Sequence, residues 1–108
     1  MERRRFRRLR TGQTYEMMGL IYFLTACYAW MPQQIQQAVV ESCQEAAGRS
    51  GNADALFVYV TQGKTKTQIM MQFYIASETS IDRMVRGYFL AMEKRLKAMK
   101  HSTGDGSL

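Results

Sequence analysis

The chain has 108 residues, of which 46% are hydrophobic, so it is long enough for one domain with a single core and too apolar to be disordered by composition. Its net charge is +6, but segment 1–10, MERRRFRRLR, alone carries six arginines and one glutamate. The remaining residues hold nine of the 15 basic residues and eight of the 9 acidic ones, so the basic charge is concentrated at one end of a nearly neutral chain.

The first segment, 1–11, is predicted to be a flexible basic arm. Clustered basic residues favour contact with nucleic acid or with an anionic membrane surface, and a tail that serves only solubility is the alternative. We expect the arm to follow DNA phosphates or to enter a minor groove beside the main contact. The arginines expected to contact phosphate are Arg3, Arg4, Arg5, Arg7, Arg8 and Arg10.

A first helix is predicted from about Thr14 to Trp30, and residues 17–31, MMGLIYFLTACYAWM, are almost wholly apolar. The run resembles a signal anchor, but it is shorter than the ~20 residues that span a bilayer. The polar segment 11–16 also separates it from the arginines. We therefore expect the buried central helix of a bundle, with a membrane segment as the less favoured alternative.

Two more helices are predicted before residue 64. Pro32 begins the second, and Gly48 ends it. Its apolar face is formed by Ile35, Ala38, Val39, Cys43 and Ala46. Residues 55–61 have a strand-like composition, but a lone strand would leave its backbone groups unpaired, so we predict a third helix ending at Gly63.

Polar residues are placed to cap the last two helices, Thr65 the fourth and Ser77 the fifth. The fifth helix, 78–100, has the most regular pattern, with an apolar stripe long enough to pack on the core and to pair with a second copy. That stripe consists of Ile81, Met84, Val85, Tyr88, Met92, Leu96 and Met99. The sequence therefore predicts an all-α fold, a small helical bundle of about five helices with a C-terminal helix-turn-helix. The single helical domain spans 12–100, and the Gly- and Ser-rich segment 101–108 is predicted to be a disordered tail.

The chain carries no recognisable catalytic motif. His101 is its one histidine, and Glu41 and Glu45, one helical turn apart, fit a solvated helix face better than an acid–base pair. Cys27 and Cys43 lie in apolar patterns and are predicted to be small buried residues of a reducing compartment. We expect no enzyme, no cofactor and no metal site.

The stretch 63–83, GKTKTQIMMQFYIASETSIDR, breaks the apolar pattern with a polar turn. A helix-turn-helix needs two short helices held together by apolar residues, with polar side chains exposed on the second. Here Ile69 and Phe73 would form the inner face of the first helix, with Ile81 and Val85 anchoring the second. Ile75 or Ala76 would fill the turn. The helix-turn-helix is predicted at about 64–97.

The same residues resemble the fourth-region DNA-binding domain of sigma-70-type factors and the small sigma-like regulators of phages and mobile elements. The resemblance covers about residues 53–97 and is carried by Gly63, Thr65, Ile69, Phe73, Ile75, Ser77, Thr79 and Ile81. Two positions depart from the family pattern, because Ala76 lengthens the turn by one residue and Tyr74 stands where the family has glycine. The resemblance implies sequence-specific DNA binding in the control of transcription.

The polar residues of this stretch supply the candidate DNA contacts. Lys64 and Lys66 begin a helix, where cations and backbone N–H groups can meet phosphate, and Arg83 or Arg86 could reach a guanine edge. Acidic side chains are repelled by phosphate but can accept from cytosine N4. The predicted DNA-contacting residues are Lys64, Thr65, Lys66, Glu78, Thr79, Asp82, Arg83 and Arg86.

These features predict a cytoplasmic DNA-binding regulator of a phage or mobile element, with double-stranded DNA as its partner. RNA polymerase or another protein, and a second copy paired through the last helix, are further candidate partners, whereas a membrane is not expected. The alternative is a small adaptor or inhibitor that binds a protein through a methionine-rich apolar surface. That surface would consist of Met17, Met18, Met70, Met71 and Met84.

Overall fold

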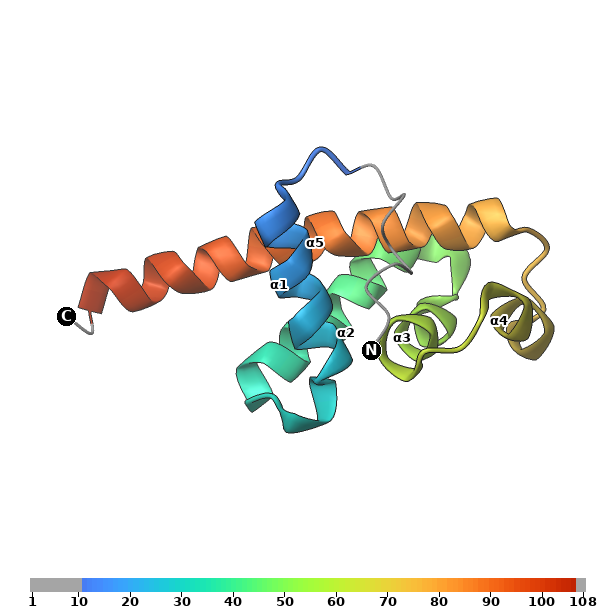
Figure 1. The fold of residues 1–108 in the computed structure, drawn as a ribbon, viewed down its shortest axis with the longest axis horizontal. Coiled ribbons are helices and arrows are strands. Elements are labelled where there is room, and N and C mark those ends of the chain that lie inside the picture. The colour runs from blue at the N-terminus through green and yellow to red at the C-terminus, as the bar shows by residue number, and fades with distance from the viewer. Residues whose placement is uncertain (1–10, 107–108) are drawn as a thin grey trace.

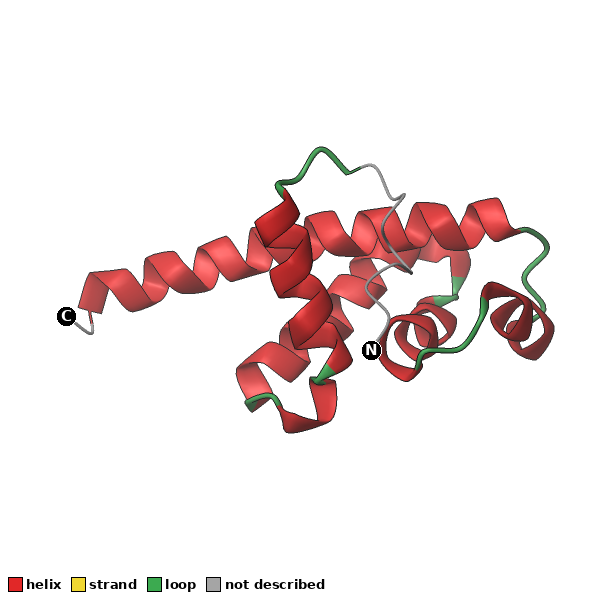
Figure 2. Cartoon of the chain, viewed as in Figure 1, coloured by secondary structure: helices red, strands yellow, loops and turns green. Residues whose placement is uncertain are grey.

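The computed structural model describes residues 11–106, and that part of the chain is entirely helices and their connections (Figures 1 and 2). The α-helices are α1 Tyr15–Ala26, α2 Gln33–Ala47, α3 Ala53–Gln62, α4 Lys66–Phe73 and α5 Glu78–Gly106, with 3₁₀ turns at Tyr28–Trp30 and Gly48–Ser50. The predicted all-α bundle of about five helices is confirmed. The segment with strand-like composition is helical too, since it lies within Ala53–Gln62.

Helix α5 is the central element of the bundle. In Figure 1 it runs along the whole molecule, and its C-terminal part extends beyond the other helices. The largest helix–helix contact is the one that α2 makes with it. The predicted stripe of α5 is buried from Ile81 to Met92, and Leu96 and Met99 are half-buried against the same core.

Helices α2 and α5 approach closely because a glycine lies at their crossing. A Cβ atom added at Gly87 would lie 3.4 Å from the Ala46 Cβ, so these two small residues let the backbones meet. Beside the crossing, Lys94 Nζ lies 2.9 Å from Glu45 Oε2, and Arg95 Nη1 lies 2.9 Å from Glu45 Oε1. Both ion pairs are partly exposed, so they orient the helices more than they stabilise them.

The helix ends follow the capping residues of the sequence. The Thr14 hydroxyl accepts from the Met17 N–H, and Thr65 forms a reciprocal capping box with Gln68. The Ser80 N–H donates to Ser77 Oγ over 3.3 Å, so the predicted caps of α4 and α5 are both confirmed. At the position before α3, the Asn52 side chain makes no capping hydrogen bond.

The predicted burial of the apolar run 17–31 is wrong. In α1 only Ile21 and Thr25 are buried, whereas Leu20 is 45% and Phe23 is 52% exposed. Helix α1 crosses the outside of the bundle, so one side of it contacts α3 and α5 and the other side faces outward (Figure 1). In the part of the chain that the structure describes, no helix combines the length and apolarity needed to cross a bilayer.

The C-terminal end of the domain differs from the prediction, and most of the predicted N-terminal arm lies outside the described residues. Helix α5 continues to Gly106, so residues 101–106 are helical where a disordered tail was predicted. Once a helix has formed, each added residue contributes one hydrogen bond without a new nucleation step, which favours such an extension. The basic arm, apart from Thr11, and residues 107–108 lie outside the described residues.

Candidate nucleic-acid interface

Helix α4, the connection 74–77 and the start of α5 form the predicted helix-turn-helix arrangement. Ile69 of α4 is buried and Phe73 is half-buried, and both belong to the core cluster or pack against it. Ile81 and Val85 anchor α5 from the other side and are buried as well. In the turn it is Ile75 that is buried, while Ala76 is exposed. The two helices are therefore held by the apolar residues that the sequence indicated.

The turn is made by Tyr74 in a left-handed backbone conformation. Its φ is 58°, and no other non-glycine residue within 11–106 has a positive φ. The N–H groups of Tyr74 and Ile75 both donate to the Met70 carbonyl, which closes the end of α4. A left-handed backbone at the end of a helix favours glycine, so a tyrosine at this position is strained.

Replacing Tyr74 with glycine is expected to stabilise the fold. Its side chain is 93% exposed, so glycine loses little packing, and it removes the ~1–2 kcal/mol cost of a side chain in the left-handed region. The larger backbone entropy of glycine in the unfolded chain offsets about 0.4–1 kcal/mol of that gain. We expect the free energy of unfolding, measured by urea denaturation, to rise by roughly 0.5–1 kcal/mol. Tyr74→Ala keeps the strained φ and should show no such rise; an equal rise in both variants would contradict the explanation.

Half of the predicted DNA-contacting residues are engaged within the protein. Lys66 Nζ lies 2.7 Å from Asp82 Oδ1, and this hydrogen bond raises the pKa of the Lys66 ammonium. The Thr65 hydroxyl accepts the capping bond of α4, and Lys64 Nζ donates to Gln72 Oε1 over 3.1 Å. The Lys66–Asp82 pair joins the first turn of α4 to α5, and because both side chains are partly exposed it helps to orient the helices without adding much stability.

The other four residues, Glu78, Thr79, Arg83 and Arg86, are exposed on α5. Thr79, Arg83 and Arg86 are spaced by four and three residues, which places them on one side of the helix. Neither arginine forms an ion pair with a described residue, whereas Lys94, Arg95 and Lys97 farther along α5 are all paired with glutamates. The start of α5 thus presents two exposed guanidinium groups that no described carboxylate neutralises by direct contact. It also carries the carboxylates of Glu78 and of Asp82, the second of which is paired with Lys66.

The methionine-rich surface expected for an adaptor is not formed as predicted. Met84 is buried, and Met17, Met18 and Met70 are half-buried against the core. Met71 alone of the five is largely exposed, at 74%. Glu41 and Glu45 both contact Arg95 of α5, at 3.6 Å and 2.9 Å, so this side of α2 faces α5.

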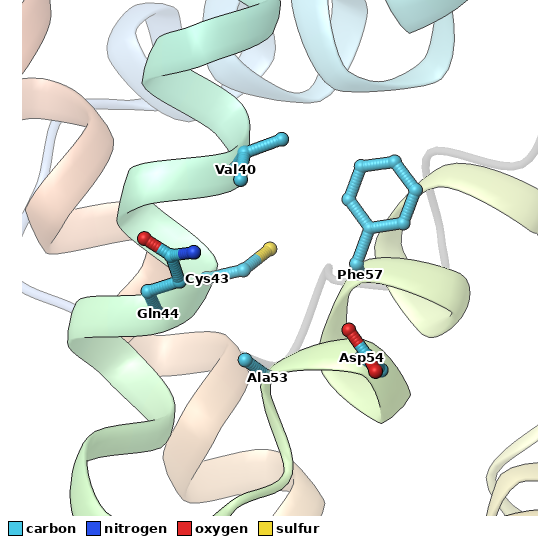
Figure 3. Close-up of a pocket in the computed structure, with 6 residues that line it drawn as sticks. All are labelled: Val40, Cys43, Gln44, Ala53, Asp54 and Phe57. Atoms are coloured by element: carbon cyan, nitrogen blue, oxygen red, sulfur yellow. The ribbon is translucent and has the colours of Figure 1, made fainter.

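A separate pocket of about 250 Å³ lies between α2 and α3 (Figure 3). Figure 3 shows the Cys43 sulfur pointing from α2 toward α3. The lining residues are Val40, Cys43, Gln44, Ala53, Asp54 and Phe57. Burial raises the pKa of the Cys43 thiol to about 12, so the thiol stays protonated and is a poor nucleophile. Both cysteines are free, with Cys27 half-buried, and the described residues include no cluster of three metal-ligating side chains.

Sequence reasoning missed two features of these surfaces. The pairing of Lys66 with Asp82 joins separate helices, so no local pattern reveals it. The outward apolar side of α1 had a signal, which is the absence of any polar face in the run, but we interpreted that signal as burial.

Comparisons with known protein families, with curated proteins and with solved structures find no match to this chain.

Proposed function

We propose that the protein binds double-stranded DNA through the start of α5 and acts in the control of transcription. The observation that carries the proposal is the pair of exposed arginines, Arg83 and Arg86, on the helix that follows a tight turn. A helix held in this way by buried residues can enter a major groove with its first two turns. The resemblance to sigma-like regulators supports the same function and suggests a phage or mobile element as its setting.

The contacts within the protein indicate which candidate residues would contact bases, which orient α5 and which would contact phosphates. Arg83 and Arg86 can each donate two hydrogen bonds to guanine O6 and N7, and Thr79 adds a short polar contact beside them. Asp82 is occupied by Lys66, so it orients α5 and does not read a base. Lys64, before α4, and the arginines of segment 1–10 would contact phosphates and supply affinity without sequence preference.

The test is selection of bound sequences from a randomised duplex library at ~150 mM salt, a concentration at which specific and non-specific binding differ clearly. Removal of one bidentate arginine–guanine pair costs about 1–3 kcal/mol, so Arg83→Ala and Arg86→Ala should each weaken binding to the selected site by about 5- to 150-fold. Each should also relax the preference at one base position. Arg49→Ala removes an exposed arginine from the Gly48–Ser50 turn and is the matched control, which should bind normally.

Deleting residues 2–10 separates the phosphate contacts of the basic arm from the base contacts of α5. The deletion should make the salt dependence of binding less steep, by up to about 0.9 in the log–log slope for each phosphate that the arm neutralises, and leave the enriched motif unchanged. Retention of DNA without an enriched motif would reduce the activity to phosphate binding by the arm. No retention at all would reject the proposal and favour a protein partner, for which the exposed Met71 and Tyr74 at the end of α4 are the candidate contact.

A further inference from the structure

Helix α1 presents apolar side chains to the outside of the molecule. Leu20 and Phe23 are about half exposed and lie three residues apart, so they project from the same side of the helix. Ile21 and Thr25 on its other side are buried, and the Thr25 hydroxyl shares a hydrogen bond with Tyr88 of α5. Helix α1 is thus fixed to the bundle by one side, and no described element covers Leu20 and Phe23 on its outward side.

Aromatic residues stand at both ends of this segment. Tyr15, the first residue of α1, is 74% exposed, and Trp30, in the turn after it, is 86% exposed. Between them Glu16 is the single residue with a formal charge at neutral pH, and it lies one turn before Leu20 on the same side of α1. Large exposed apolar side chains gathered on one element usually mark an interaction site.

The chain reaches α1 from the segment that holds its excess charge. Segment 1–10 carries six arginines and one glutamate and joins α1 through residues 11–14. An apolar surface and a dense cationic segment therefore adjoin in sequence. Membrane-surface proteins use this combination, because an apolar face alone or a basic cluster alone binds weakly and the two together bind stably.

We infer that the outward side of α1 docks on an anionic lipid surface, with the arginines of segment 1–10 contacting the headgroups. With 12 residues α1 is ~18 Å long, so it fits in the plane of the interface and does not cross the ~30 Å hydrocarbon layer. Leu20 and Phe23 would enter the acyl boundary. Tyr15 and Trp30 would lie at headgroup level, where such aromatic residues are enriched.

Charge complementarity selects lipid among the partners. DNA offers phosphates to the arginines but nothing apolar to Leu20 and Phe23. A second copy of the chain offers an apolar face but brings the same excess of positive charge. An anionic leaflet supplies both anionic groups and an apolar interior. The α1 surface is separate from the proposed DNA contact, since α1 and the residues before it meet α5 at Tyr88 and Phe89, whereas α4 meets it at Asp82. The arginines of segment 1–10 are common to both proposals, so the variant Leu20→Asp/Phe23→Asp, and not the deletion, distinguishes them.

The test is flotation of the full chain with vesicles of phosphatidylcholine alone or of phosphatidylcholine mixed with phosphatidylserine. We expect the chain to float with the anionic vesicles and to remain unbound with the neutral ones. The double variant Leu20→Asp/Phe23→Asp and the deletion of 2–10 should each reduce flotation at least tenfold. The double variant Met71→Asp/Tyr74→Asp adds the same charge at exposed apolar sites on the α4 end and should float like the unmodified chain.

Trp30 provides a second measurement that needs no variant, because it is the single tryptophan of the chain and is largely exposed. Its fluorescence should shift to shorter wavelength when anionic vesicles are added and should not shift with neutral ones. Flotation that survives Leu20→Asp/Phe23→Asp, or an unshifted Trp30 spectrum, would overturn the inference. A dimer in light scattering that this double variant dissociates would also overturn it and assign the surface to a second copy. The variant Leu20→Asp/Phe23→Asp should still enrich the same DNA motif as the unmodified chain. Failure of the lipid-docking inference and failure of the DNA-binding proposal can therefore be distinguished.

Discussion

Replacing Tyr88 with alanine is expected to lower the free energy of unfolding by about 3–5 kcal/mol, the cost of removing a large ring from a packed core. Tyr88 is fully buried at the middle of α5 and packs edge-on against Phe89 with ring centroids 5.8 Å apart. Its hydroxyl shares a hydrogen bond with Thr25, which ties α1 to α5. A destabilisation this large approaches the total stability of a small domain, so the variant should be partly unfolded. Urea denaturation followed by far-ultraviolet circular dichroism measures the change.

Tyr88→Phe isolates the hydroxyl from the ring. It keeps the packing but leaves the buried Thr25 hydroxyl without its Tyr88 partner, so the expected cost is only about 1–3 kcal/mol. Thr25→Val likewise leaves the Tyr88 hydroxyl without its Thr25 partner. The double variant Thr25→Val/Tyr88→Phe should then cost less than the two single changes added together. Strict additivity would show that the hydrogen bond contributes nothing to stability.

Gly87→Leu is the second change with a large expected effect. The atoms of a leucine beyond Cβ would enter space that α2 occupies around Ala46. Overpacking of this kind costs about 1–3 kcal/mol, and it would separate the helices that the Glu45 ion pairs join. We expect a lower urea midpoint together with weaker DNA binding, because displacement of α5 moves Arg83 and Arg86.

Gly87→Ala is the matched control for that effect. A Cβ 3.4 Å from Ala46 Cβ is at ordinary contact distance, and alanine favours a helix interior by about 1 kcal/mol over glycine. Gly87→Ala should therefore be as stable as the unmodified protein or slightly more stable. A destabilisation by Gly87→Ala as large as that by Gly87→Leu would mean that the crossing tolerates no side chain at all.

The helix ends could be predicted because they depend on single residues and local geometry. Thr65 and Ser77 cap their helices as expected, and Gly63 follows α3 with a φ of 71°. The turn at Tyr74 also depends on local geometry, since its left-handed backbone ends α4 as the left-handed backbone of Gly63 ends α3.

Which surface residues are exposed and which contact another helix was harder to predict, because this depends on how the helices pack together. An apolar run is equally compatible with a central helix and with one that crosses the outside, and α1 is the second kind. Among the candidate DNA-contacting residues, Lys66 and Asp82 bind each other, which only the placement of α4 on α5 reveals. The exposure of Arg83 and Arg86 was predictable, since both lie off the apolar stripe.

The late position of α5 in the chain has a consequence for biosynthesis. Three hydrogen bonds join α5 to residues early in the chain: Gln13 with Glu93, Thr25 with Tyr88 and Glu45 with Lys94. Translation proceeds from the N-terminus, so α1 to α4 leave the ribosome before the helix that covers them. During that interval α1 lacks its contacts with α5, and a nascent chain that stalls before residue 88 holds one half of each of these hydrogen bonds. Folding of this domain therefore requires the emergence of α5, and until then the growing chain exposes apolar surface that chaperones and proteases recognise.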